Sequence, residues 1–196
     1  MTELASLDLP ETQWLDLSIA GSSPAVRLAR LGSDPMTRAS VSLVRFPPGW
    51  RRPGSGHYLP AEEFVVLEGS IDVVGSHGPG DYVYLPPRTD RTDSVSTSGA
   101  LVIAWFSGFP EWVPGAAAAE PATAPVTVSA ADVAGVLRAD APEVAGEYAV
   151  LRDAAGRDPL PVDADVLDPA ARAWAWVPAG TPLPAGTGPL HVRTWA

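Results

Sequence analysis

The chain has 196 residues, of which 46% are hydrophobic, a net charge of -10 and no cysteine. This length allows one well-buried core with a modest extension, and the absence of cysteine excludes disulfides and thiolate metal sites. All thirteen basic residues are Arg and none form a cluster, which argues against binding to nucleic acid or to an anionic membrane, since both need a positive face.

The beginning of the chain lacks the features of a signal peptide. Residues 1–11 contain three acidic side chains and no basic segment followed by an apolar core. The strongest apolar run, residues 100–106, is too short to span a bilayer. We therefore expect a soluble cytoplasmic protein.

Short β-prone runs separated by Pro and Gly predict an all-β fold, a sandwich or a barrel. After a loose arm over residues 1–13, the expected strands cover residues 26–28, 40–44, 63–67, 71–74, 81–85 and 101–106. Residues 40–44 alternate polar and apolar side chains, as a half-buried strand does. The turn at residues 68–70 predicts that the strands on either side of it form a hairpin.

The second half of the chain differs in composition. Residues 113–125 are rich in Ala and Pro and predict a linker between a first domain, residues 1–112, and a C-terminal extension, residues 126–196. Ser129 and Asp132 form a capping-box-like pair that predicts one short helix, with Val133, Val136 and Leu137 on its packing face.

The extension also echoes the front of the chain. Residues 151–159 are similar to 28–35, and residues 171–180 are similar to 38–49, in the same order. The extension is thus either a truncated second copy of the first domain's opening strands or a chance similarity within an Ala-, Pro- and Arg-rich sequence.

The spacing of residues 49–69 resembles the first motif of the cupin family, in which a Gly, five residues, His-x-His, three or four residues, a Glu, six residues and a Gly follow one another. Gly49, Ser55, His57, Glu62 and Gly69 occupy these positions. The second motif, a Gly, five residues, Pro-x-Gly, two residues and a His, has the spacing of Gly80, residues 86–88 and Arg91. The resemblance covers residues 40–107 and implies a cupin double-stranded β-helix, a jelly-roll barrel.

The same resemblance implies a metal held by two His of the first motif, the Glu, and the His of the second. His57 and Glu62 keep their positions, whereas Ser55 and Arg91 replace the other two ligands. A guanidinium is protonated and has no lone pair for a metal, so we expect no metal cofactor. Fe, Mn, Ni or Zn bound by His57 and Glu62 stays as the alternative.

Arg91 is expected to occupy the vacated cavity and to pair with Glu62, near His57. The pair is either a structural replacement of a lost metal site or an active one, in which Arg91 binds an anionic group and His57 or Glu62 moves a proton. The expected substrate-binding residues are Arg91, Ser55, Trp50, Tyr82, Tyr84 and Trp105.

Three functions remain open from the sequence. The first is a metal-independent isomerase, lyase or cyclase that acts on a small organic molecule with His57, Glu62 and Arg91 as catalytic residues. The second is a non-catalytic or regulatory module that binds a ligand in the same cavity, and the third is a mononuclear-metal dioxygenase. A homodimer and a monomer are both compatible with the edge strands that such a fold exposes.

Overall fold

The computed structural model describes residues 2–130, 132, 134–141, 143–154 and 157–195, and these form β-strands, one short 3-10 turn (Glu11–Gln13) and loops. The chain divides into two compact units. We call residues 10–131 the double-sheet unit, and residues 1–9 with 132–196 the single-sheet unit. Within the described part of the chain, no helix has the length and apolar character that crossing a membrane requires.

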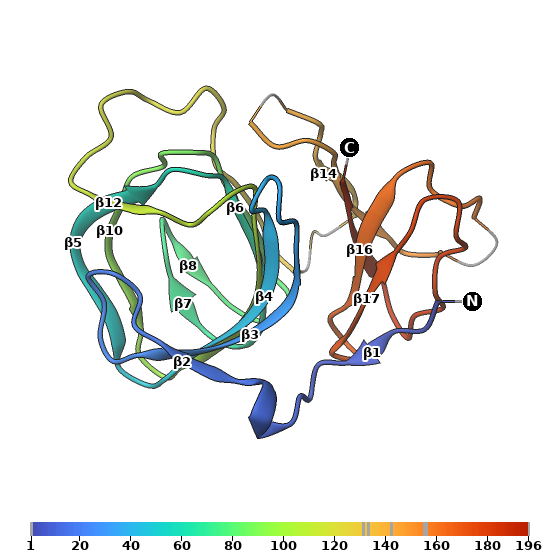
Figure 1. The fold of residues 1–196 in the computed structure, drawn as a ribbon, viewed down its shortest axis with the longest axis horizontal. Coiled ribbons are helices and arrows are strands. Elements are labelled where there is room, and N and C mark those ends of the chain that lie inside the picture. Colours follow the sequence, from blue (N-terminus) through green and yellow to red (C-terminus); the bar gives the residue numbers. More distant parts are fainter. Residues whose placement is uncertain (1, 131, 133, 142, 155–156, 196) are drawn as a thin grey trace. The chain divides into compact units, whose positions relative to one another are not determined.

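The double-sheet unit contains a seven-stranded and a five-stranded sheet that face each other (Figure 1). In spatial order, the larger sheet consists of β13 (Val126–Val128), β9 (Tyr82–Leu85), β6 (Glu62–Gly69), β11 (Ala100–Phe106), β4 (Ser40–Phe46), β3 (Val26–Ser33) and β2 (Leu15–Leu17). The smaller sheet consists of β12 (Trp112–Pro114), β5 (Trp50–Tyr58), β10 (Arg91–Ser96), β7 (Ile71–Asp72) and β8 (Ser76–His77). All pairings are antiparallel.

Side chains from both sheets build one apolar core. β4, β6 and β11 are central in the larger sheet, and their alternate residues contribute Val44, Phe64 and Val102, while the smaller sheet contributes Trp50 and Ile71. The all-β prediction is confirmed, but the sheets do not close into the expected barrel. No hydrogen-bonded ladder among the described strands joins the edges of one sheet to those of the other.

The predicted hairpin around Gly69 is wrong, because β6 belongs to the larger sheet and β7 to the smaller one. Gly69 has a positive φ of 69°, which lets the chain leave the sheet, and a Cβ there would lie 2.9 Å from the carbonyl carbon of Gly99. Ser96 Oγ then donates to the carbonyl of Ser70 at 2.6 Å. This crossing carries the chain between the two sheets.

The single-sheet unit is a six-stranded antiparallel sheet. Its strands, in spatial order, are β1 (Ala5–Ser6), β17 (Ala173–Val177), β16 (Asp163–Asp168), β18 (Leu190–Trp195), β15 (Tyr148–Leu151) and β14 (Gly135–Arg138). One face buries an apolar cluster that includes Val166, Val177 and Val192.

The short helix predicted from Ser129 is wrong. Val136 lies in β14 and pairs with Ala149 of β15, while Val133 lies outside the described residues. Gly135 has φ of 76°, a conformation that interrupts a helix, and a helix of under two turns gains too few hydrogen bonds to offset its nucleation cost. Pairing with an adjacent strand stabilises this segment instead.

Candidate functional site

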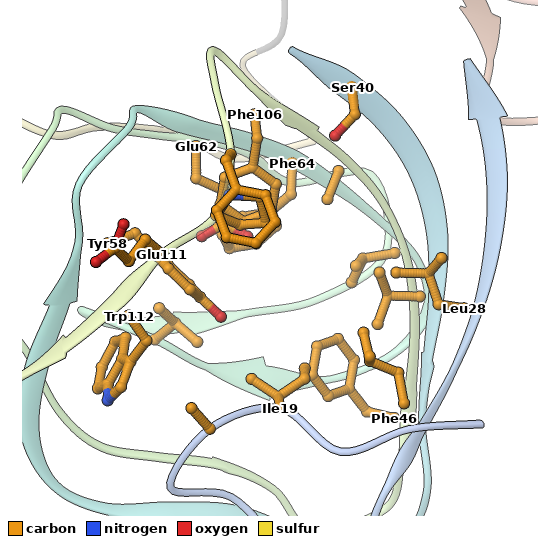
Figure 2. Close-up of a pocket in the computed structure, with 18 of the residues that line it drawn as sticks. Ile19, Leu28, Ser40, Phe46, Tyr58, Glu62, Phe64, Phe106, Glu111 and Trp112 are labelled. Atoms are coloured by element: carbon orange, nitrogen blue, oxygen red, sulfur yellow. The ribbon is translucent and has the colours of Figure 1, made fainter. Parts of the chain in front are cut away.

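A cavity of about 720 Å³ opens between the two sheets of the double-sheet unit. Most of its wall is apolar, and Figure 2 shows Ile19, Leu28, Phe46, Phe64 and Phe106 around the same space. The volume lies in the range of pockets that hold small organic molecules, which are typically apolar with a few convergent polar groups.

A compact polar cluster forms one part of this wall: Arg52 and Tyr58 of β5, Glu62 of β6, and Arg91 of β10. Arg91 Nη1 donates to Glu62 Oε2 in a salt bridge. Arg52 Nη2 donates to Tyr58 Oη at 2.7 Å. Both guanidinium groups lie near the Tyr58 ring, with Cζ–centroid distances of 5.1 Å for Arg52 and 4.7 Å for Arg91. Two cations, one carboxylate and one phenol thus share a small region.

Trp112 of β12 completes this cluster. The guanidinium of Arg52 stacks over the Trp112 ring at 3.9 Å, and the rings of Tyr58 and Trp112 meet edge to face with centroids 5.2 Å apart. The indole occupies the space that a side chain at Gly56 would need, since a Cβ there would lie 2.6 Å from Trp112 Cε2 and 2.7 Å from the Val113 carbonyl oxygen. Gly56 is therefore the residue that allows β12 to lie against β5.

The alternation of β5 decides which side chains face the cavity. Trp50, Arg52 and Tyr58 line it, so even-numbered positions point inward and odd-numbered positions point away. His57 is buried on the other side, where its Nδ1 lies 3.3 Å from the carbonyl oxygen of Gly115 and 3.8 Å from Asp90 Oδ1. Glu62 and Arg91 line the cavity and His57 does not, so the expectation that all three share it is wrong.

Ser55 also points away from the cavity, and it is exposed. The aromatic side chains expected to line the site divide in the same manner. Trp50 lines the cavity, whereas Tyr82, Tyr84 and Trp105 are buried on the opposite face of the larger sheet. On that face Tyr82 Oη donates to Glu63 Oε1 at 2.7 Å, so Glu63 is a buried hydrogen-bonded carboxylate.

The motif resemblance seen in the sequence implies a metal, and the residues that line the cavity do not fit one. The inward positions of β5 that precede Glu62 are Gly56, which has no side chain, and Tyr58. Glu62 is already bound to a guanidinium, and a second guanidinium lies beside Tyr58, so a cation here would meet repulsion. Among the described residues, no group of three or more His, Asp or Glu has the arrangement to hold a metal ion.

The surroundings of Tyr58 favour its protonated form, and two guanidinium groups beside it have an N–H without a hydrogen-bond partner among the described residues. Burial raises the pKa of Tyr58, the Arg52 charge opposes this rise, and the Glu62 charge adds to it. The Nε atoms of Arg52 and Arg91 are buried, and neither has a hydrogen-bond partner among the described residues. The phenol is therefore a neutral hydrogen-bonding group at pH 7.

Of the residues expected at the site, Trp50, Glu62 and Arg91 line the cavity. Arg52, Tyr58 and Trp112 also line it and were not expected from the sequence. The motif spacing counted from Gly49 predicted that the side chain of His57 faces the cavity. In β5 the residues that face the cavity are instead Trp50, Arg52 and Tyr58, so the predicted register is off by one residue. A shift of one residue moves a side chain to the other face of a strand. A strand assignment for residues 50–58 would have identified Arg52 and Tyr58, but Pro53, Gly54 and Gly56 concealed it.

No protein-family model matches the chain, and no curated protein matches its sequence. Among solved structures, a candidate dioxygenase from Nostoc punctiforme is 15% identical, with 93% of this chain and 82% of that chain covered at a TM-score of 0.65. The protein Ylba from E. coli is 13% identical, with 92% of this chain and 82% of that chain covered at a TM-score of 0.53.

A cupin-like protein from Thermotoga maritima is 21% identical over 51% of this chain and 84% of that chain, with a TM-score of 0.40. At these identities the likeness concerns the fold and carries no activity with it. The two structures that align with more than nine-tenths of this chain show that it shares their fold.

Proposed function

We propose that the cavity of the double-sheet unit binds a small organic molecule without a metal ion. The observation that carries this proposal is the contact between Gly56 and Trp112. Residue 56 has no side chain to direct into the cavity, and the indole of Trp112 occupies the space that such a side chain would need. The Arg91–Glu62 salt bridge also supports binding without a metal, since the Glu62 carboxylate is already paired with a guanidinium.

The apolar wall of the cavity indicates that the ligand has a large apolar part. Burial of apolar surface supplies most of the favourable free energy in pockets of this kind, at roughly 25 cal/mol per Å². Phe46, Phe64 and Val102 offer that surface, and the polar cluster around Tyr58 offers directional contacts at one place. A ligand with an apolar body and one polar group matches this distribution.

Acid–base catalysis is the second candidate function, and Tyr58 is the observation that favours it. With His57 on the other face, Tyr58 and Glu62 are the groups of the polar cluster that can transfer a proton. Glu62 is held by Arg91, and Tyr58 is kept neutral by its raised pKa, so Tyr58 would act as the acid. An isomerase, lyase or cyclase would use such a group, whereas a metal-dependent dioxygenase is less consistent with these residues.

The test uses a neutral fluorescent probe, N-phenyl-1-naphthylamine, titrated into the purified full chain with and without a chelator. We expect saturable binding that the chelator does not change. Ala104→Leu places extra side-chain volume in the cavity wall and should weaken probe binding, because Ala104 lines the cavity and is buried.

Ser98→Leu is the matched control, since Ser98 is exposed between β10 and β11 and adds similar apolar volume outside the cavity. Circular dichroism and urea unfolding establish that both variants fold. Equal probe affinity in the two folded variants, or loss of binding after chelation, would contradict the proposal.

A further inference from the structure

We propose that the natural ligand is an organic carboxylate, with its carboxylate bound by Arg52 and its apolar body in the cavity. This inference deepens the proposed function and depends on it.

Arg52 is a buried cation without a compensating anion. Its side chain is 4% exposed, its Nη2 donates to the neutral Tyr58 hydroxyl, and its Nε has no hydrogen-bond partner among the described residues. No carboxylate of the described residues forms an ion pair with Arg52. Burying a charge without a counter-charge is unfavourable, so an anion in the cavity would stabilise this arrangement.

Arg91 supplies the comparison within the same cluster. Its guanidinium is equally buried, but Glu62 neutralises it. The cluster of Arg52, Tyr58, Glu62 and Arg91 therefore carries one excess positive charge at pH 7, with Tyr58 protonated. One carboxylate from a ligand would bring this region to neutrality.

The geometry of Arg52 favours a planar anion. Its guanidinium is stacked on Trp112 at 3.9 Å and lies 5.9 Å from the Trp50 ring centroid, so aromatic rings hold its plane. A stacked guanidinium leaves its in-plane N–H groups for hydrogen bonding, and a carboxylate can accept two of them at once. Arg52 itself lines the cavity, which gives a ligand access to it.

Besides Glu62, two carboxylates line the cavity, those of Asp34 and Glu111. Asp34 is bonded to the Met36 amide at 2.7 Å and to Thr37 Oγ1 at 2.8 Å, and Glu111 lies in the exposed segment that precedes β12. Neither pairs with Arg52 among the described residues. Their charges would disfavour a second anionic group on the ligand near those positions, which favours a monocarboxylate.

The experiment compares three probes with the same eight-carbon body: octanoate, 1-octanol and octylamine. Isothermal titration calorimetry at pH 7 should show octanoate binding about ten- to a hundredfold more tightly than 1-octanol, as a charge-assisted hydrogen bond provides. Octylamine should bind most weakly, because its ammonium group would face a guanidinium.

Arg52→Met keeps the length and apolar stem of the side chain and removes its charge. In this variant octanoate should bind no more tightly than 1-octanol. Arg51→Met is the matched control, since Arg51 is the adjacent residue of β5 and is exposed on the other face. Arg52→Lys should give a preference for octanoate between those of wild type and Arg52→Met. The ammonium group keeps the positive charge but cannot donate two parallel hydrogen bonds to a carboxylate as a guanidinium does.

The outcomes separate this inference from the proposed function. If 1-octanol binds wild type as tightly as octanoate, and Ala104→Leu weakens both, the cavity binds ligands but the carboxylate inference is overturned. The same holds if folded Arg52→Met keeps the preference for octanoate. If the neutral naphthylamine probe and all three eight-carbon probes bind neither wild type nor variant, the proposed function itself fails.

Discussion

The indole of Trp112 lies against the Cα of Gly56, in the space that any side chain at residue 56 would enter. Their strands pair antiparallel, with Gly56 opposite Pro114 and Trp112 opposite Tyr58. This contact brings an aromatic face under Arg52 and removes a side chain from the inward row of β5. Residue 56 thus has no side chain to direct into the cavity, and Arg52 stacks on the indole that takes its place.

Gly56→Ala should destabilise the protein by about 1–3 kcal/mol, because the new Cβ must displace Trp112 or the backbone of Val113. Urea unfolding followed by tryptophan fluorescence measures this change. Gly78→Ala is the control, since a Cβ at Gly78 meets no atom within 4 Å, and it should change stability by under about 1 kcal/mol. Equal stability of the two variants would contradict the contact.

Arg91 is buried and Glu62 is largely so, and the two should therefore behave as a coupled pair. Glu62→Gln and Arg91→Met should each destabilise the protein by about 2–4 kcal/mol, since each leaves one charge buried without its partner. The double variant should be less destabilised than the sum of the two single variants. Urea unfolding of all four proteins gives the coupling energy.

The exposed pair of Arg27 and Glu11 is the control for that cycle. Arg27 Nη1 lies 2.6 Å from Glu11 Oε2, but both side chains contact solvent. Glu11→Gln should therefore change stability by under about 1 kcal/mol. Additive effects at Glu62 and Arg91 would show that the two side chains do not depend on each other.

Much of the fold could be predicted from the sequence because its central strands are apolar and bounded by turn residues. β4, β9 and β11 were expected within a residue or two, since Val, Leu, Ile and Tyr dominate them and Pro or Gly follows most of them. β5 was not expected, because Pro53 and the three glycines within or beside it are residues typical of loops. Its stability comes from pairing with β10 and β12, which local sequence does not show.

The candidate site was predictable only in part for the same reason. Motif spacing located Glu62 and Arg91, which are anchored in β6 and at the start of β10. It could not locate Trp112, which is separated from Gly56 by more than fifty residues and reaches the site through the pairing of β12 with β5. Contacts between such distant segments depend on tertiary packing rather than on any local pattern.

Tyr58 should ionise at higher pH than an ordinary tyrosine, because burial raises its pKa. Its contribution to stability is fully present below the unfolded pKa of about 10 and is lost as the pH rises through the native pKa. Phenolate absorbance titrations of wild type and Tyr58→Phe should differ by one group that ionises above the ordinary tyrosine pKa. A difference that titrates near pH 10 would contradict the raised pKa.

His191 in the single-sheet unit should make stability fall in acid. Burial lowers the pKa of His191 to about 4, against an opposing effect of the Asp168 charge, and its Nδ1 lies 3.0 Å from Tyr148 Oη. Between about pH 6.5 and pH 4 the unfolded state binds a proton that the native state does not, so stability decreases as the pH falls.

His191→Gln should remove about 1–2 kcal/mol of that decrease between pH 7.5 and pH 5. Urea unfolding of the variant and of wild type at both pH values gives the difference. His77→Gln provides a comparison, since His77 is also buried but belongs to the double-sheet unit. A pH dependence identical in wild type and His191→Gln would contradict the buried neutral imidazole.

The most direct test of the central claim, a ligand cavity that operates without a metal, is elemental analysis of protein purified without chelator and then incubated with Fe, Mn, Ni or Zn salts. The Gly56–Trp112 contact and the Arg91–Glu62 pair predict metal far below one equivalent, together with octanoate binding that a chelator does not alter. A stoichiometric metal that is lost in folded Glu62→Gln would contradict the claim.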